Sequence, residues 1–260
     1  MKKRVLSLLL ALVMVLSLLP VTALAVGGHD GQVRVRVENT TWTKADGAPW
    51  EGTLVDEWVT LKDDSTMMSC VKDALEKNHY SYETASSTYG GEYLGEVNGL
   101  AEMDGGAQSG WMGTLNDWFT NASFSAFNTK DGTLAAGDEI RVLYTKNGYG
   151  ADIGGDWSTQ SNTALAALSF SSGTLSPAFN KDTLEYTLTL AEPGDVRVAV
   201  TAANKCNQVY LSVGETSYRR SAAIPMEDGT VLTLRCGDAA EATEYNDAVV
   251  PTTYIVTVKA

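Results

Sequence analysis

Few residues in this chain have the types and spacing that catalysis or metal binding requires. His29 and His79 are its only histidines, and GxSxG, HExxH, CxxC and phosphate-loop motifs are all absent. Carboxylates are plentiful, but a sequence does not show which two face each other across a cleft. We therefore expect a protein that is not an enzyme and has no metal site or resident cofactor. A hydrolase is the last of three hypotheses.

The ten residues from Ser109 to Trp118, SGWMGTLNDW, are the strongest candidate for a binding site. Their aromatic and thioether groups can cover the faces of a flat ligand, and their hydroxyl and amide groups can bond its polar substituents. The residues that we predict to bind a ligand are Ser109, Trp111, Met112, Thr114, Asn116 and Trp118. Trp111 and Met112 alternate on a predicted strand, so one of them must point into the core. A core position for Trp111 is the competing interpretation.

The residues around this stretch predict strands and one helix. Residues 32–38 alternate between valine and charged or polar side chains, which is typical of a half-buried strand. A helix is predicted to open at residues 63–65, where two acids and Ser65 can cap it, and to stop at Asn78. Further strands are predicted over residues 55–61, 93–100 and 139–145, with turns at Asn98-Gly99 and Asn116-Asp117.

The second half of the chain has a different pattern. Residues 146–163 are rich in glycine, serine and asparagine without apolar periodicity, which indicates an inter-domain linker. Asp152 and Asp156 lack the ligand spacing of a calcium loop, so we interpret them as solvated linker residues. From residue 164 onward only short alternating strands separated by turns are visible, which favours an antiparallel β-sandwich.

Residues 1–25 have the pattern of a secretory signal. A basic start is followed by an apolar run over residues 5–19 and by small residues at Ala23 and Ala25. The run is too short to span a bilayer, and cleavage after Ala25 would change the formal net charge from −13 to −16 by removing three basic residues. We expect a secreted or extracellular protein that can also associate with the cell surface. Its acidity argues against nucleic acid as a partner, and no membrane span is expected in the mature chain.

The chain has three cysteines. Cys206 and Cys236 lie in the same half and can form a disulfide in an oxidising compartment, which would stabilise the fold by about 3–4 kcal/mol on the chain-entropy estimate. The spacing alone leaves this pairing open. Cys70 lies on the apolar face of the predicted helix, so we interpret it as a buried, inert thiol.

Five separated motifs are shared, in the same order, with a bacterial secreted domain family. They are VRVRV at residues 33–37, VKDAL at 71–75, YLGEVNGL at 93–100, SGWM at 109–112 and GDEIRVLY at 137–144. Residues 31–145 thus resemble a family related to the C-terminal β domain of transcobalamin and intrinsic factor. The resemblance implies a β-grasp-like fold, with one helix across a mixed sheet. It also implies a soluble ligand-binding role, with cobalamin or another corrinoid as the leading ligand.

The chain departs from that family in two respects. Gly113 and Asn116-Asp117 stand where the family has an aromatic residue and Asn-Gly. Transcobalamin also holds its ligand between this domain and a helical domain, and this sequence contains no helical domain. The resemblance therefore implies weak binding, or a pocket that a partner protein completes.

A second resemblance covers the start of the C-terminal half. LAALSFSSGTLSPAFN at residues 165–180, followed by YTLT at 186–189, is similar to the cadherin-like β-sandwich repeats of bacterial surface proteins. Such modules are mostly spacers or adhesion units, so we expect no binding site here. The side chains that we assign to a solvated face are Tyr210, Tyr218, Arg219 and Arg220.

The sequence thus predicts a mainly β protein. A signal peptide (1–25) precedes a β-grasp-like α+β domain (31–145), a linker (146–163) and an all-β immunoglobulin-like, cadherin-like sandwich (164–260). The leading hypothesis is a secreted or cell-surface, non-enzymatic protein that binds cobalamin or a related corrinoid. The alternative is a structural or adhesive surface protein with a protein or glycan partner, which clustered tyrosines such as Tyr80, Tyr82 and Tyr93 would suit.

Overall fold

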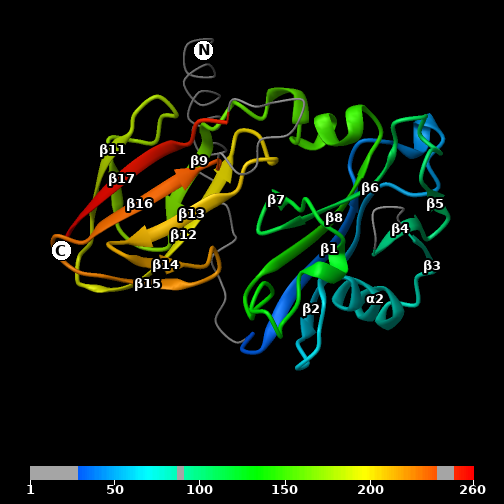
Figure 1. The fold of residues 1–260 in the computed structure, drawn as a ribbon, viewed down its shortest axis with the longest axis horizontal. Helices are drawn as coiled ribbons and strands as arrows, with labels where there is room; N and C mark the ends of the chain where they lie inside the picture. The colour runs from blue at the N-terminus through cyan, green and yellow to red at the C-terminus, as the bar shows by residue number, and fades with distance from the viewer. Residues whose placement is uncertain (1–28, 87–90, 239–248) are drawn as a thin grey trace, which may run out of the picture.

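The computed structural model describes residues 29–86, 91–238 and 249–260 (Figure 1). The predicted signal at residues 1–25 lies outside the described residues. The described chain is mainly β and forms several sheets, as the sequence predicts. Within the same ranges, no helix has both the length and the apolar character that crossing a bilayer would require. We call residues 29–145 the first unit and residues 164–260 the second unit, in each case without the undescribed residues.

The first unit is built on a five-stranded mixed sheet. Its order is β2 (Gly52–Thr60), β1 (Gln32–Asn39), β8 (Glu139–Thr145), β6 (Gly110–Leu115) and β7 (Trp118–Phe119). β1 runs antiparallel to β2 and parallel to β8, and β6 runs antiparallel to β8. The valines of β1 are fully buried on one face, while Arg34 and Arg36 lie on the other. The predicted strands at 32–38 and 139–145 are therefore confirmed.

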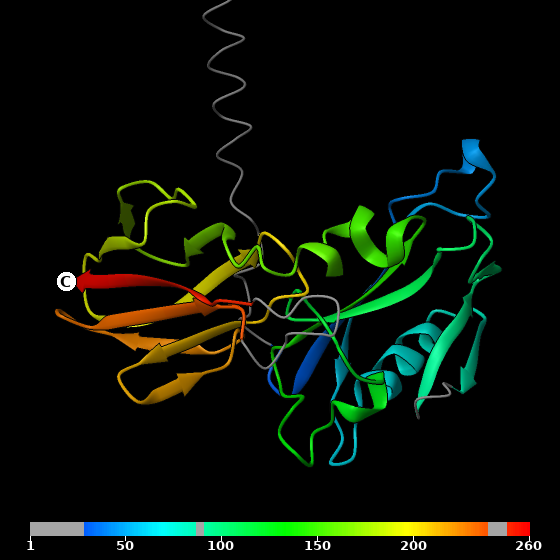
Figure 2. The same ribbon diagram turned by 45° about the horizontal axis from the view of Figure 1, so that its top comes forward.

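A single α-helix of the described chain, α2 (Met67–Lys77), covers the buried face of this sheet (Figure 2). Its N-cap is Thr66, whose side chain accepts a hydrogen bond from the backbone N–H of Ser69. The predicted cap at residues 63–65 is therefore wrong by one residue or more, because several cap-competent side chains follow one another here. The helix gives way to Asn78, as predicted.

Two further pieces complete the first unit. A small sheet has the order β3 (Tyr82–Ser86), β4 (Glu92–Val97) and β5 (Leu100–Ala101). The strand predicted from residue 93 is β4, and the predicted turn at Asn98-Gly99 is confirmed, since both residues have positive φ; Leu100 lies beyond it, on β5. Short 3-10 helices are η1 (Lys44–Asp46) and η2 (Phe124–Ala126).

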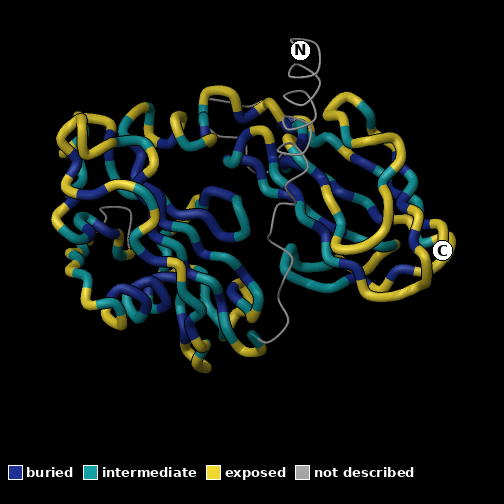
Figure 3. The backbone as a smooth tube through the Cα atoms, turned by 180° about the vertical axis from the view of Figure 1, so that it is seen from behind, coloured by how far each residue is buried: buried dark blue, intermediate teal, exposed yellow. Residues whose placement is uncertain are grey.

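The second unit is a pair of packed sheets with its own core (Figure 3). One sheet has the order β10 (Thr174–Ser176), β11 (Glu185–Thr189), β17 (Thr252–Lys259), β16 (Val231–Cys236), β13 (Val209–Val213) and β14 (Thr216–Tyr218). The other has the order β15 (Ala223–Met226), β12 (Gly194–Ala202) and β9 (Leu165–Phe170). The prediction of purely antiparallel strands is wrong, because β11 pairs in parallel with β17.

Residues 146–163 are folded rather than an extended solvated chain. They contain two 3-10 segments, η3 (Gly148–Ile153) and η4 (Trp157–Thr159). The carboxylate of Asp152 accepts hydrogen bonds from Thr145 Oγ1 at 2.5 Å and from the backbone N–H of Lys146 at 2.9 Å. Asp152 therefore fixes the turn that leaves β8, and its side chain is exposed, as the sequence predicts.

Gly113 on β6 has no room for a side chain. A Cβ at this position would overlap the Phe124 ring and would lie 2.9 Å from Met67 Cε. We expect Gly113→Ala to lower the free energy of unfolding by about 1–3 kcal/mol, the usual range for overpacking. Urea denaturation would measure this decrease in the free energy of unfolding. Gly194→Ala is the matched control, because a Cβ there meets no atom within 4 Å; equal stability of the two variants would contradict the packing of η2 on β6.

Cys70 is buried on α2, and desolvation raises the pKa of its thiol to about 11. At pH 8 about 0.1 % of such a thiol is ionised, so we expect no alkylation of Cys70 by iodoacetamide in the native protein. Mass spectrometry after labelling in denaturant without reductant gives the control. In denaturant, one labelled cysteine would indicate a Cys206–Cys236 disulfide, and three labelled cysteines would exclude it. In the native protein, rapid labelling of Cys70 would contradict its burial.

Candidate functional site

Ser109, Trp111, Met112 and Thr114 do not meet in one site. Ser109 belongs to a turn, where its hydroxyl accepts hydrogen bonds from Tyr144 Oη at 2.9 Å and from the backbone N–H of Gly105 at 3.0 Å. It also donates to the carbonyl of Gly106 at 2.8 Å. Because these bonds tie the turn together and to Tyr144 of β8, Ser109 holds the chain that enters β6.

Trp111 packs against the core of the first unit. Its ring lies 5.8 Å from the Trp50 ring and 5.2 Å from the Tyr144 ring, and its Nε1–H donates to the carbonyl of Leu100 at 3.0 Å. Both its apolar faces and its polar atom are thus engaged. This arrangement matches the competing interpretation of Trp111 as a core residue.

Met112 and Thr114 lie on the opposite face of β6. Met112 packs against a small third core made by Phe119, Leu143 and Cys206, which joins the two units. Thr114 is fully buried on this face, and its Oγ1 has no hydrogen-bond partner among the described residues. The alternation predicted for Trp111 and Met112 is therefore confirmed, and each side chain is partly buried against a core on its own face of β6.

Asn116 and Trp118 are the two predicted residues that lie in the wall of a cavity. Asn116 and Asp117 form the β6–β7 turn with φ values of 52° and 67°, the backbone that a two-residue hairpin requires. The Asn116 amide donates to Asp138 Oδ1 at 2.9 Å and accepts from the backbone N–H of Glu139 at 3.0 Å. The turn therefore holds Asn116 rigidly at the edge of the cavity.

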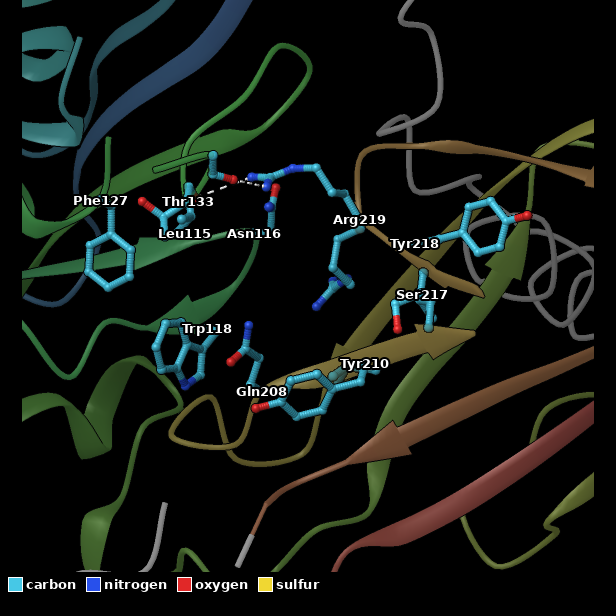
Figure 4. Close-up of a pocket in the computed structure, with 14 residues that line it drawn as sticks. Leu115, Asn116, Trp118, Phe127, Thr133, Gln208, Tyr210, Ser217, Tyr218 and Arg219 are labelled. Carbon is cyan, nitrogen blue, oxygen red and sulfur yellow. Dashed lines mark hydrogen bonds between the residues drawn. The ribbon is translucent and has the colours of Figure 1, made fainter. Parts of the chain in front are cut away.

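This cavity, which we call the interface cavity, lies between the first and second units. Its volume is about 500 Å³, within the range of small-molecule sites. One wall comes from the β6–β7 hairpin and residues 127–133, and the other from β13, β14 and the residues after β14. Figure 4 shows the rings of Phe127, Trp118 and Tyr210 along one side of it. The ring of Tyr218 points away from them and packs on the second core.

The rings of the interface cavity are held in place by their neighbours. Trp118 is 8 % exposed, and its ring meets the Phe127 ring edge-on at 6.0 Å between centroids. Arg235 stacks over the Tyr210 ring at 4.7 Å. Because neighbouring side chains make these contacts, the rings are held in a fixed orientation.

Two adjacent arginines complete the wall. Arg219 Nη1 donates to the carbonyl of Gly132 at 2.6 Å, and its Nη2 pairs with Asp138 and donates to the carbonyl of Thr133 at 3.2 Å. Arg220 Nη2 donates to the carbonyl of Val200 within the second unit. Burial lowers the pKa of the Arg220 guanidinium, since desolvation disfavours its charged form.

Most of this site is not visible in the sequence, where no motif marks Phe127. The residues predicted to lie on a solvated face are partly exposed, and they also line the interface cavity: Tyr210, Tyr218, Arg219 and Arg220. The only available signal was an Arg-Arg pair in a strongly acidic chain, and it did not show which surface the pair would face.

The two units are joined by charged and backbone contacts around the same cavity. Lys205 forms an ion pair with Asp117, and its carbonyl accepts from the backbone N–H of Phe119 at 2.8 Å. Ser221 Oγ donates to Asp138 Oδ1 at 2.9 Å. Because Asp117 and Asp138 flank the β6–β7 turn and β8, these contacts fix one wall against the other.

Among the residues that the structure describes, no group of three or more His, Cys, Asp or Glu side chains could hold a metal ion. His29 stacks on Trp58 with ring centroids 3.9 Å apart. No protein-family model matches this chain, and no curated protein matches its sequence. The site must therefore be interpreted from its own geometry.

Asp138 is fully buried between the two units and bonds to both. We expect Asp138→Ala to lower the free energy of unfolding by about 1–3 kcal/mol, because the donors of Asn116 and Ser221 would lose their buried acceptor while Arg219 is partly exposed to water. Asp182→Ala is the control, since Asp182 pairs with Lys181 on the exposed surface, where a pair is worth at most about 1 kcal/mol. Urea unfolding of both variants measures the difference in the free energy of unfolding. A decrease below about 1 kcal/mol for Asp138→Ala would show that Asp138 does not hold the two units together.

Proposed function

We propose that this protein is a secreted, non-enzymatic binding protein that holds a small molecule in the interface cavity. The observation that carries the proposal is the cavity itself, with three rings from two units that each have a core of their own. Aromatic walls with a few fixed polar groups are the usual composition of a small-molecule site. Secretion and extracellular location rest on the signal-like residues 1–25.

We propose a β-grasp-like domain followed by an immunoglobulin-like sandwich. The first assignment is supported by the strand order β2-β1-β8-β6-β7, by the central parallel pair of β1 and β8, and by α2 across one face. The second is supported by two stacked sheets that share one core. The relation to transcobalamin-like and cadherin-like families is part of the same proposal.

A corrinoid is the first ligand to test. The transcobalamin-like resemblance implies it, and the second unit supplies a second wall where the family has a helical domain. The site would then lie around Trp118 and Asn116, while Trp111 and Met112 would support it from the interior.

The alternative, a structural or adhesive surface protein, is favoured by one specific observation. Trp111 packs against the core of the first unit, and four of the six predicted ligand residues do not line the interface cavity. In that case the aromatic surface around the interface cavity would contact a protein or glycan partner.

Calorimetric titration of residues 26–260 with cobalamin and with cobinamide tests the proposal. We expect micromolar or tighter binding that weakens at least about tenfold in Trp118→Ala, since a hot-spot aromatic contributes about 2 kcal/mol or more. Trp58→Ala is the matched control, because Trp58 lies on β2, at the opposite edge of the sheet from β7. Thermal unfolding must show that both variants are folded.

The opposite result is equally informative. An absence of heat at millimolar cobalamin and cobinamide would remove corrinoids as ligands of this chain alone. Equal weakening by Trp118→Ala and Trp58→Ala would contradict the placement of the site in the interface cavity.

A further inference from the structure

The charge of the interface cavity is opposite to that of the whole chain. The formal net charge is −13, yet the described residues that line the cavity include two arginines and no aspartate or glutamate. An acidic protein repels anions at long range, so any affinity for an anion must come from a local site. The cavity is such a local site.

The two arginines differ in how they are used. Arg219 is bonded to two carbonyls and to the Asp138 carboxylate, so its guanidinium belongs to the contact between the units. Arg220 has one hydrogen bond, to the carbonyl of Val200, and forms no ion pair with any described residue. A guanidinium carries five N–H donors, so most of those on Arg220 have no partner among the described residues.

The nearby carboxylates do not neutralise Arg220. Asp117 is paired with Lys205 and lies 3.8 Å from Arg141. Glu139 lies 3.5 Å from Arg34. Both acids act on Arg220 from beyond ion-pair distance, and both have cationic partners of their own. Arg220 therefore has no counter-ion among the residues that the structure describes, and a ligand can supply one.

Rings and charge occur in one cavity. Phe127, Trp118 and Tyr210 offer apolar surface, and Arg220 lines the same space. A planar guanidinium binds carboxylate and phosphate oxygens through two parallel hydrogen bonds. We propose that the interface cavity binds a ligand that joins a flat or apolar-faced ring to a carboxylate or phosphate, and that Arg220 binds the anionic group. This inference rests on the proposed function, because it names the ligand class of the same cavity.

Matched probes separate the ring from the charge. Calorimetry on residues 26–260 would compare 2-naphthoate with its uncharged amide 2-naphthamide, and D-glucuronate with D-glucose. 2-Naphthyl phosphate would distinguish a phosphate from a carboxylate. NMR spectra would report whether each probe reaches the cavity, through a shift of the Trp118 indole N–H resonance. That resonance is assigned by its disappearance in Trp118→Phe. We expect the charged member of at least one pair to bind at least about tenfold more tightly, as a charge-assisted hydrogen bond predicts.

Arg220→Gln should remove that preference and lower the affinity for the charged probe about tenfold or more, while Arg220→Lys should restore part of it. Arg197→Gln is the matched control, because Arg197 also lacks an ion pair with any described residue but lies outside the cavity lining. Circular dichroism and thermal unfolding must show that the variants are folded.

The outcomes divide cleanly. Equal binding of charged and uncharged probes, unchanged in Arg220→Gln, would overturn the anion inference and leave the cavity as a ligand site. Equal weakening by Arg220→Gln and Arg197→Gln would also overturn it, since the effect would then be one of net charge. No binding of any ring probe at millimolar concentration, with no shift of the Trp118 signal, would overturn both the inference and the proposed function of the cavity.

Discussion

The buried carboxylate of Asp138 is the constraint on which the arrangement of the two units depends. It accepts hydrogen bonds from the Asn116 amide and from the backbone of Ala135 in its own unit, and from Ser221 and Arg219 in the other. A buried carboxylate is tolerated only when it is fully paired, so each of these donors has a structural reason to be where it is. The β6–β7 turn, the start of β8 and the segment after β14 are thereby fixed together, and the interface cavity is the space that they enclose with β13.

The parts of the fold that depend on local pattern could be predicted from the sequence. Alternating valines predicted β1, and the alternation of Ile140 and Val142 predicted β8, with bounds close to those observed. The helix was predicted from its apolar stripe, but its start was placed too early because the residues before Met67 can all act as caps. The spacing of apolar residues and the residue types of a turn depend on positions close together in the sequence, so both can be recognised before the fold is known.

The candidate site could be predicted only in part, because its walls come from distant segments. Alternation showed that Trp111 and Met112 point to opposite faces, but it could not show that both faces of β6 are covered. Trp118 was selected for its type, while Tyr210 and Arg220 are about 100 residues away and look like ordinary surface positions in a sandwich. Which surfaces meet is decided by long-range pairing, such as that of Arg219 with Asp138, and no short motif encodes it.

The two adjacent arginines have different hydrogen-bond partners, and this difference explains how the cavity is built. Arg219 uses its donors to hold the walls together, so the cavity exists before a ligand arrives, and a ligand does not have to supply the energy of assembly. Arg220 keeps donors that no neighbour in the described part of the chain uses. A ligand bound between the walls contacts both units, so by linkage it stabilises their association by the free energy of its binding. The same contacts that stabilise the two-unit arrangement therefore also preserve a cation for recognition.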